Sequence, residues 1–564
     1  MRNDTLESNE IQLNFLDDID MMEEVSAAAC NQQASGICST AEGVNTIASG
    51  VASHAEGIYN TATGDYSHVE GANSFSIGVA SHAEGNGSVA YGDASHAEGV
   101  GTTTGDVTSS LSGMGAHAEG LATSAIGLGS HAEGAHTVAN GNDAHAEGYG
   151  TKANGFASHA EGSTTTASGD FSHTEGQNTI ASETSCHAEG YQTVSSSPAS
   201  HAEGYKTTAS GLASHAEGQN TIANVTSSHA EGNSTIASGF ASHAEGSTTT
   251  ASGDFSHAEG QNTIASGGTA HAEGYNTIAS GFASHAEGDS TQAAEACHAE
   301  GHRTRAFGFC SHAEGSETVA SGLASHAEGM GTNTADFNGT HIMGRYGDAT
   351  ESYSWFVGNG IASNTRSLGA KWLASTGNMY IDGSTYVTSG ADYAEMFEIV
   401  SDPIDFGFFV TLEEDKVRKA TEQDTFILGI TSATPSVLGN SAEMSWKNKY
   451  VVDRWGQRQY EEVLIPAEMD EEGRIITPAR WEKQLKINPD WDPSQPYRSR
   501  IDRPEWVTVG LLGQMLVRDD GTCEVNGYCL PNDKGVATAS ARGYRVLKRM
   551  DADQILILFD GVKK

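Results

Sequence analysis

The sequence is poor in the residues that fill an ordinary globular core. Aromatic residues make up 7% of its 564 residues, and only ten prolines and seven cysteines are present. The cysteines stand at positions 30, 38, 186, 297, 310, 523 and 529, without a regular spacing. Scattered cysteines argue against a disulfide framework and favour folding in a reducing compartment such as the cytoplasm.

Basic residues are scarce as well. The chain has 30 Lys and Arg against 73 Asp and Glu, a formal net charge of −43, and residues 40–344 hold only four basic residues against 32 acidic ones. Without a basic cluster we expect no binding to nucleic acid. Residues 1–39 lack a cationic start followed by an apolar run, and nothing after residue 344 resembles a membrane-spanning segment. We therefore expect no secretory signal and no membrane insertion.

A short repeat dominates what is present. The tetrapeptide HAEG, or a close variant, returns every fourteen residues between Thr40 and Gly344. A unit this short cannot enclose its own core, so each copy must be one coil of a solenoid that buries its apolar side against its neighbours. Seven extra residues between His96 and His117, and one missing residue between His285 and His298, are interpreted as loop adjustments.

Two positions inside the repeat are restricted to small residues. Glycine follows the motif Glu in every copy, as at Gly57 and Gly329, which indicates positive φ or a close backbone approach. Alanine recurs eight residues after the motif His, as at Ala139, Ala153 and Ala265. The interior is therefore too narrow for Leu or Phe, and the sequence predicts a thin β-coil.

The motif His and Glu are two residues apart, so in a strand they point to the same face. Stacked coils then align them in two columns, with a spacing of about 4.8 Å between successive coils. We expect His to hydrogen-bond the neighbouring carboxylates, which would raise the folded-state pKa of the His and make the formal charge an overstatement. A divalent metal is the alternative, because imidazole and carboxylate are both ligands. Regular stacking alone explains the columns, so we predict no metal site and no cofactor.

Composition changes near residue 345. All seven Trp and nine of the ten Pro lie beyond it, and no His follows His341. Residues 345–391 are interpreted as a short β-rich neck and residues 392–564 as a mainly β domain with an ordinary core.

The segment SGADYAEMFE, Ser389 to Glu398, lies where neck and domain meet. Asp392 and Glu395 have the D-x-x-E spacing of a capping box that begins a helix. Two neighbouring carboxyls can instead divide the acid and base roles of amide hydrolysis. Ser389 is either a turn residue beside Gly390 or a possible nucleophile. The spacing alone favours the cap.

Two resemblances sharpen these expectations. The HAEG and A-S-G strings resemble the head repeats of trimeric autotransporter (YadA-like) adhesins, which implies a left-handed parallel β-roll assembled as a homotrimer. The C-terminal segment, with the downstream strings LGI, YEEV, RPEW, VGLLG and NGYC, resembles the self-cleaving intramolecular chaperone domain of phage neck appendages and tail spikes, a glutamic autopeptidase. That resemblance implies a scissile bond at Ala391–Asp392, with Asp392 and Glu395 as the acidic pair.

We therefore expect an all-β chain in four parts: an attachment segment (1–39), a β-roll head (40–344), a neck (345–391) and an autoproteolytic chaperone domain (392–564). The corresponding function is a trimeric virion appendage that is assembled in the host cytoplasm and contacts a host-surface glycan or protein. Its N-terminus would join it to tail or neck proteins of the particle. The alternative is a non-enzymatic surface adhesin with a structural C-terminal cap.

Overall fold

The computed structural model describes residues 30–564 apart from 108–110, 384–386, 442–448, 470–474, 478, 497 and 562–564. Most of the predicted attachment segment therefore lies outside the described residues. The chain divides into two compact units. The first unit comprises the chain up to Ala374 together with Asn378–Tyr380. The second comprises Ser375–Gly377 and the chain from Ile381 onward.

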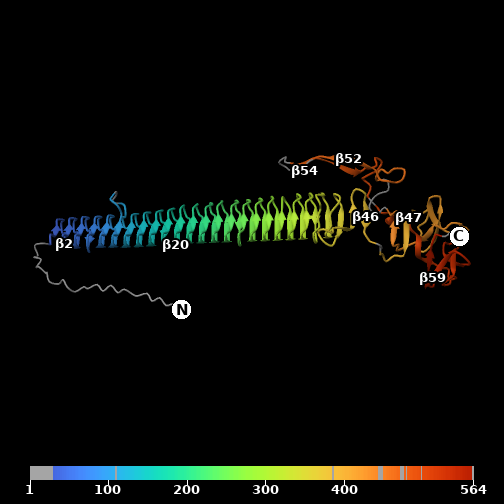
Figure 1. Cartoon of the computed structure of the whole chain (residues 1–564), viewed down its shortest axis with the longest axis horizontal. Helices are drawn as coiled ribbons and strands as arrows, with labels where there is room; N and C mark the ends of the chain where they lie inside the picture. The colour runs from blue at the N-terminus through green and yellow to red at the C-terminus, as the bar shows by residue number, and fades with distance from the viewer. Residues whose placement is uncertain are drawn as a thin grey trace, which may run out of the picture. The chain divides into compact units, whose positions relative to one another are not determined.

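The first unit is a parallel β-solenoid with two strands per coil. The long strands begin at the motif His and run from β2 (Thr40–Val44) to β43 (His341–Arg345), and the short ones from β1 (Gln33–Ala34) to β41 (Val319–Ala320). Each full-length long strand pairs with a full-length neighbour in register, His on His and Glu on Glu, and the short strands form a second sheet of 21 strands. Figure 1 shows the coils stacked in one row past β20 (His173–Gln177). The predicted all-β, parallel solenoid is confirmed.

Small side chains fill the solenoid, as predicted. In one coil Ser214, Ala216, Thr221 and Ala223 point inward and are at most 1% exposed, and the same pattern recurs along the rod. The Ser214 hydroxyl donates to the carbonyl oxygen of Gly211 at 2.8 Å. Because the interior is only as wide as these side chains, each coil gains most of its burial from the coils above and below it.

Backbone geometry explains the glycine after the motif Glu. Gly218 has φ +103°, and a Cβ there would lie 2.2 Å from the carbonyl oxygen of Gly232 in the next coil. Two further residues of the same coil, Ala213 and Asn220, have φ near +55°. Ala213 and Asn220 lie seven residues apart, one at each of the two corners where the chain passes from one sheet to the other.

The irregular spacings leave the ladder of long strands in register. Strand β10 (His96–Val100) pairs in register with β12 (His117–Leu121), so the extra residues between them do not interrupt the ladder. Strand β36 (His285–Asp289) pairs in the same way with β38 (His298–His302). Both interpretations from the sequence are confirmed.

Not every coil carries a full-length long strand. Four of them shrink to the first two residues of the motif: β6 (His68–Val69), β18 (His159–Ala160), β30 (His243–Ala244) and β42 (His326–Ala327). An isolated bridge such as Tyr149–Ser163 resumes the pairing at the end of the motif.

The solenoid ends in larger apolar residues. Strand β43 pairs in parallel with β44 (Trp355–Asn359), which pairs antiparallel with β45 (Leu368–Leu373). Strand β46 (Asn378–Ile381) follows. Ile342 and Phe356 are buried here, where earlier coils hold alanine, so they close the end of the narrow interior.

The second unit is built around one long strand. Strand β56 (Trp506–Arg518) pairs with β47 (Asp392–Glu398), β50 (Gly429–Thr431) and β60 (Gln554–Phe559). The same sheet contains β48 (Phe409–Glu413), β49 (Lys416–Lys419), β51 (Val437–Gly439), β57 (Tyr528–Pro531), β58 (Ala537–Ser540) and β59 (Tyr544–Asp551). Two small antiparallel pairs lie apart from it: β52 (Tyr460–Ile465) with β55 (Arg480–Leu485), and β53 (Glu468–Met469) with β54 (Ile475–Thr477). A 3₁₀ turn covers Arg500–Asp502.

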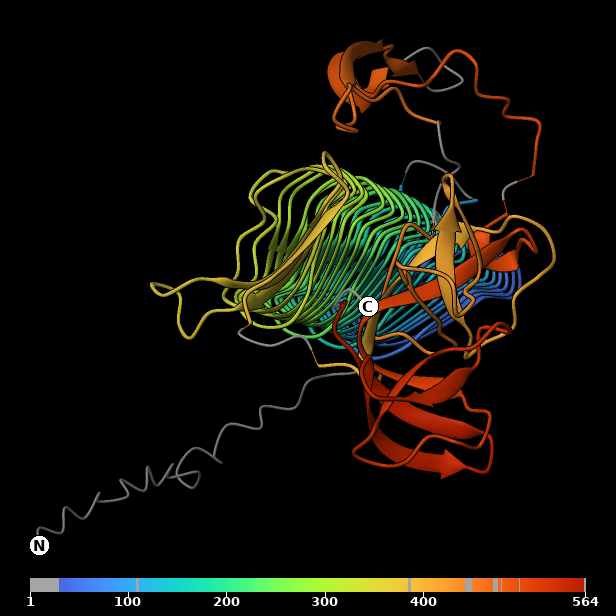
Figure 2. The same ribbon diagram turned by 90° about the vertical axis from the view of Figure 1, so that its right-hand side faces the viewer.

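This unit has the ordinary core that the composition predicts. Phe409, Ile430, Val517, Ile555 and Phe559 are buried in it, and Figure 2 shows the sheet in orange and red. The thiols of residues 523 and 529 are free and buried in the same core, as packing groups. No helix in the described part of the chain is long and apolar enough to span a membrane.

Candidate functional site

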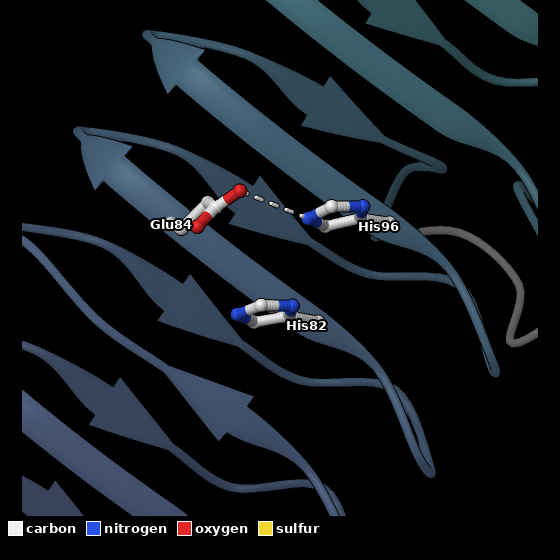
Figure 3. Close-up of side chains that lie close together, drawn as sticks. All are labelled: His82, Glu84 and His96. Carbon is white, nitrogen blue, oxygen red and sulfur yellow. Dashed lines mark ion pairs between the residues drawn. The ribbon is translucent and has the colours of Figure 1, made fainter.

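The motif His and Glu form two adjacent columns along the solenoid. Consecutive imidazole rings stack face to face at 4.5 to 4.9 Å between centroids. Glu84 reaches toward His96 of the next coil, with Nε2 of His96 and Oε1 of Glu84 3.4 Å apart, and Figure 3 shows it to one side of the stacked His82 and His96 rings. In other coils the His pairs with the Glu of its own strand, as for His187 and Glu189, whose Nε2 and Oε2 are 3.5 Å apart. The predicted columns are present.

The contacts within the columns differ from the prediction. Among the described residues, the motif His Nε2 atoms from His54 to His341 have no hydrogen-bond partner. For His187 and His229 the expected rise in pKa is wrong: burial between stacked rings, followed by the neighbouring His charges, lowers the pKa of both. The Glu charges raise the pKa of these two histidines, but solvent screens them, so the lowering by desolvation is the larger effect.

Neighbouring Glu carboxyls interact more strongly with each other than with His. A hydrogen bond with Glu161 raises the pKa of Glu147 to about 7, and the pKa of Glu161 is lowered chiefly because it accepts that bond. Glu231 and Glu245 form a second such pair. Glu147, Glu231 and Glu259, whose pKa values are raised to about 7, are therefore partly protonated at neutral pH, and the formal charge overstates the real one for this reason.

Replacing Glu147 by Gln should stabilise the protein above pH 7. A carboxyl whose folded pKa is raised to about 7 from 4.5 stabilises the fold at low pH, and this contribution is lost as the pH rises through 7. Glutamine keeps the hydrogen bond without the charge, so we expect a gain of about 0.5 kcal/mol at pH 8 that disappears by pH 5. Melting temperatures at the two pH values measure it. Glu183→Gln, outside the column, is the control, and an equal gain at both pH values would contradict the shared proton.

His and Glu of the columns also lie close enough to hold a cation. The ligand atoms of His82, Glu84 and His96 all lie within 4.8 Å of one another, and similar sets recur along the rod. The absence of a metal at these columns stays a prediction.

The acidic motif of the second unit begins its first strand. Residues Asp392 to Glu398 form β47, which is antiparallel to β56 and parallel to β51. The interpretation of Asp392 as the N-cap of a helix is therefore wrong. Pairing with residues more than one hundred positions later in the chain overrides the local capping pattern.

Asp392 is buried at the point where β47 starts. It is 5% exposed, and its Oδ2 has no hydrogen-bond partner in the described part of the chain. Burial raises the pKa of the carboxyl, and a hydrogen bond with Ser432 offsets part of this. A carboxyl in this state holds a proton more readily than an exposed one, which suits a general acid.

Glu395 points away from Asp392. Side chains alternate along β47, so Asp392 and Ala394 are buried while Tyr393 and Glu395 lie on the other face. The Tyr393 hydroxyl donates to Glu395 Oε1 at 2.5 Å. The two carboxyls predicted as a pair are therefore not brought together within one chain, and their catalytic roles stay predictions.

The backbone at the predicted scissile bond borders a cleft of about 650 Å³. Ser389, Gly390, Ala391 and Asp392 line it, and Ser389 is exposed. The cleft leaves room for water at the bond, but the structure gives Ser389 no partner that would activate it among the described residues. Its role as a nucleophile stays a prediction.

Sequence reasoning missed Ser436. Its backbone N–H and hydroxyl donate to the carbonyl oxygen of Asp392 at 2.8 and 2.7 Å and hold the start of β47 in place. No local signal points to this residue, because the contact joins positions 44 apart.

Comparisons with known proteins find matches for both the solenoid and the second unit. Residues 344–552 match the family Peptidase_G2, IMC autoproteolytic cleavage domain. The YadA head domain repeat matches residues 41–67, 70–101, 118–144, 202–224, 258–284 and 272–291. The chain thus combines a YadA-type repeat solenoid with a segment of the autoproteolytic class.

The particular relatives are phage appendage proteins. The chain is 35% identical over 193 residues to the pre-neck appendage protein of Bacillus phage B103, which covers 31% of this chain and 21% of that protein. It is 34% identical over 171 residues to the pre-neck appendage protein of Bacillus phage phi29, covering 30% and 18%. The crystal structure of the C-terminal fragment of phi29 gene product 12 matches at 30% identity, covering 30% of this chain and all of the fragment, with a TM-score of 0.25. The chain spans about a fifth of the length of these curated relatives.

Proposed function

We propose that the chain is a virion appendage whose C-terminal domain cleaves the chain once, at Ala391–Asp392. The observation that carries the proposal is the buried Asp392 carboxyl at the first residue of β47, in a segment that matches an autoproteolytic family. The proposed scissile bond lies immediately before the first strand of the sheet. Cleavage there removes no strand from the domain.

The proposed chemistry is hydrolysis by two carboxyls in separate roles. Glu395 acts as the base that takes a proton from water, and Asp392 supplies a proton to the leaving nitrogen, which is its own backbone nitrogen. Hydroxide adds to the carbonyl carbon of Ala391, the C–N bond breaks, and the products are a carboxylate and an amine. Because Glu395 lies on the opposite face of β47, it would act on a neighbouring chain in a trimer.

Self-cleavage is tested on purified full-length protein. We expect two fragments on a denaturing gel, and N-terminal sequencing of the smaller should read Asp-Tyr-Ala-Glu. A chain that stays intact after prolonged incubation would exclude the peptidase proposal and leave a non-enzymatic adhesin with a structural cap. In the appendage proposal the domain also assists trimer folding, the N-terminus joins the particle, and the solenoid contacts a host-surface glycan or protein.

The solenoid is expected to be stable only as a homotrimer. Its interior buries little beyond Ala, Ser and Thr, and apolar side chains such as Ile180, Ile264 and Phe75 are about 40% exposed on its short strands. Association would bury more of this surface and offset the cost of ordering so thin a coil. Light scattering or native mass measurement should give three times 58.8 kDa for the uncleaved chain. A folded monomer at micromolar concentration would contradict the prediction.

A further inference from the structure

The backbone of β56 comes unusually close to the proposed scissile bond. The carbonyl oxygen of Ala391 accepts a hydrogen bond from the backbone N–H of Gln514 at 3.2 Å. Next to this donor, Gly513 has φ +121°, and a Cβ on it would lie 2.3 Å from the same oxygen and 2.9 Å from Asp392 Cα. Only glycine allows the donor strand to approach this carbonyl so closely.

A bulge in the same strand makes room for the Asp392 carboxyl. Tyr393 pairs with Leu512 but Ala394 pairs with Gly510, so β56 carries one extra residue opposite β47. A Cβ on Gly510 would lie 2.8 Å from Asp392 Oδ2. Bulges of this kind redirect groups of one strand toward a site. The two glycines therefore leave space on either side of the Ala391–Asp392 peptide bond. Gly513 leaves it at the carbonyl oxygen of Ala391, and Gly510 leaves it at the side-chain carboxyl of Asp392.

We propose that the Gln514 N–H is the oxyanion donor of the self-cleavage reaction, positioned by Gly513. The proposal rests on cleavage at Ala391–Asp392. When hydroxide adds to the carbonyl carbon, the C=O electron pair moves onto the oxygen, and the N–H already aimed at that oxygen stabilises the charge. The pair then returns to reform C=O as the C–N bond breaks and the nitrogen of Asp392 takes a proton. One water is consumed, and no other reactant is needed.

A preorganised donor suits this reaction because it acts where charge develops. At 3.2 Å the bond is long in the resting state and shortens as the oxygen becomes negative. Removing one such donor typically slows acyl transfer by about 100- to 1000-fold. The cleft described above is lined by Gln514 as well as by Ala391, so the donor and the scissile peptide both border a space that can hold water.

The first test is Gly513→Ala in the full-length chain. The added methyl group must push β56 away from Ala391, so we expect cleavage to slow at least about 100-fold while the trimer still forms. The matched control is Gly521→Ala, because Gly521 also has positive φ, +89°, but none of the described residues lies within 4 Å of its added Cβ. The control should cleave at the wild-type rate, measured as fragment against time on a denaturing gel.

A second variant separates catalysis from strand distortion. Replacing residue 514 with the α-hydroxy acid by nonsense suppression exchanges the N–H for an ester oxygen and adds no bulk. We expect the same loss of rate, by the same factor across the pH range, with the fold and the trimer retained and a fall in stability of only about 1 kcal/mol from the lost hydrogen bond. If wild-type protein cleaves at Ala391–Asp392 and the ester variant keeps its rate, the oxyanion assignment is wrong. If wild-type protein does not cleave there, the proposed function itself fails.

Discussion

Glu395→Gln should abolish cleavage while leaving the fold and the trimer unchanged. Glutamine keeps the size of the side chain and can still accept the hydrogen bond from Tyr393, but it cannot take a proton from water. Loss of a general base typically slows a reaction by about 100- to 10,000-fold, so the variant should remain a single band over a time in which wild type is cut completely. The same gel assay and light scattering measure the two properties.

The control for this variant lies on the same strand. Glu398→Gln makes the same chemical change and breaks only an exposed ion pair with Lys416, which is 2.6 Å long, so it should cleave normally. Asp392→Asn should also stop cleavage because it removes the proposed acid. If Glu395→Gln cleaves as fast as wild type, the acidic-pair mechanism fails and Ser389 becomes the residue to test.

Mixed trimers show which chain supplies the base. If Glu395 acts between chains, a Glu395→Gln chain should be cut when it assembles with Asp392→Asn chains, which retain their glutamate. Trimers of either variant alone should stay intact. A failure of the mixed trimers to cleave would place both groups in one chain, which requires β47 to rearrange, because the two side chains now lie on opposite faces.

Gly218→Ala should break the solenoid locally and lower its stability by about 3 kcal/mol or more. The substitution forces an L-residue into φ +103° and places its Cβ 2.2 Å from the backbone oxygen of Gly232, so two coils must separate. The oxygen that the Cβ meets belongs to the backbone of the next coil, which cannot yield as a flexible side chain could. Thermal unfolding and limited proteolysis near residue 218 measure the effect.

The control for this substitution is Gly101→Ala. Gly101 also has positive φ, +67°, but no atom of the described part of the chain lies within 4 Å of an added Cβ, and alanine occupies the equivalent corner at Ala122. We expect a loss of about 1 kcal/mol from the backbone strain alone. Equal effects at the two positions would mean that φ, and not the approach of the next coil, requires the glycine after the motif Glu.

The solenoid was predictable because its constraints are local and repeated. A fourteen-residue period, an invariant glycine and a recurring alanine each restrict one coil, and stacking applies the same restriction to every coil. The behaviour of the His column was not predictable in this way. Spacing shows that Glu lies near His187, but only the structure shows that stacked rings bury the imidazole enough to lower its pKa.

The candidate site, unlike the solenoid, depends mainly on contacts between residues far apart in the sequence. The motif SGADYAEMFE identifies Asp392 and Glu395, yet its D-x-x-E spacing fits a helix start as well as a strand. The segment forms a strand and not a helix because it pairs with β56, more than one hundred positions later in the chain, and because Ser436 holds its first residue. The same long-range pairing brings Gly513 and Gln514 to Ala391, which no local pattern indicates.

The direction of hydrogen bonding in the solenoid has a mechanical consequence. Its ladder bonds run from coil to coil, along the rod, so a pull on the two ends loads every bond of one junction together. The tensile strength of the rod is then that of its weakest junction, whatever its length. The shortened strands β18 and β30 share two ladder pairs and one isolated bridge with each neighbour, where a full-length strand shares five pairs. Fracture under load should begin at these coils, and the intact segments on either side should keep their form.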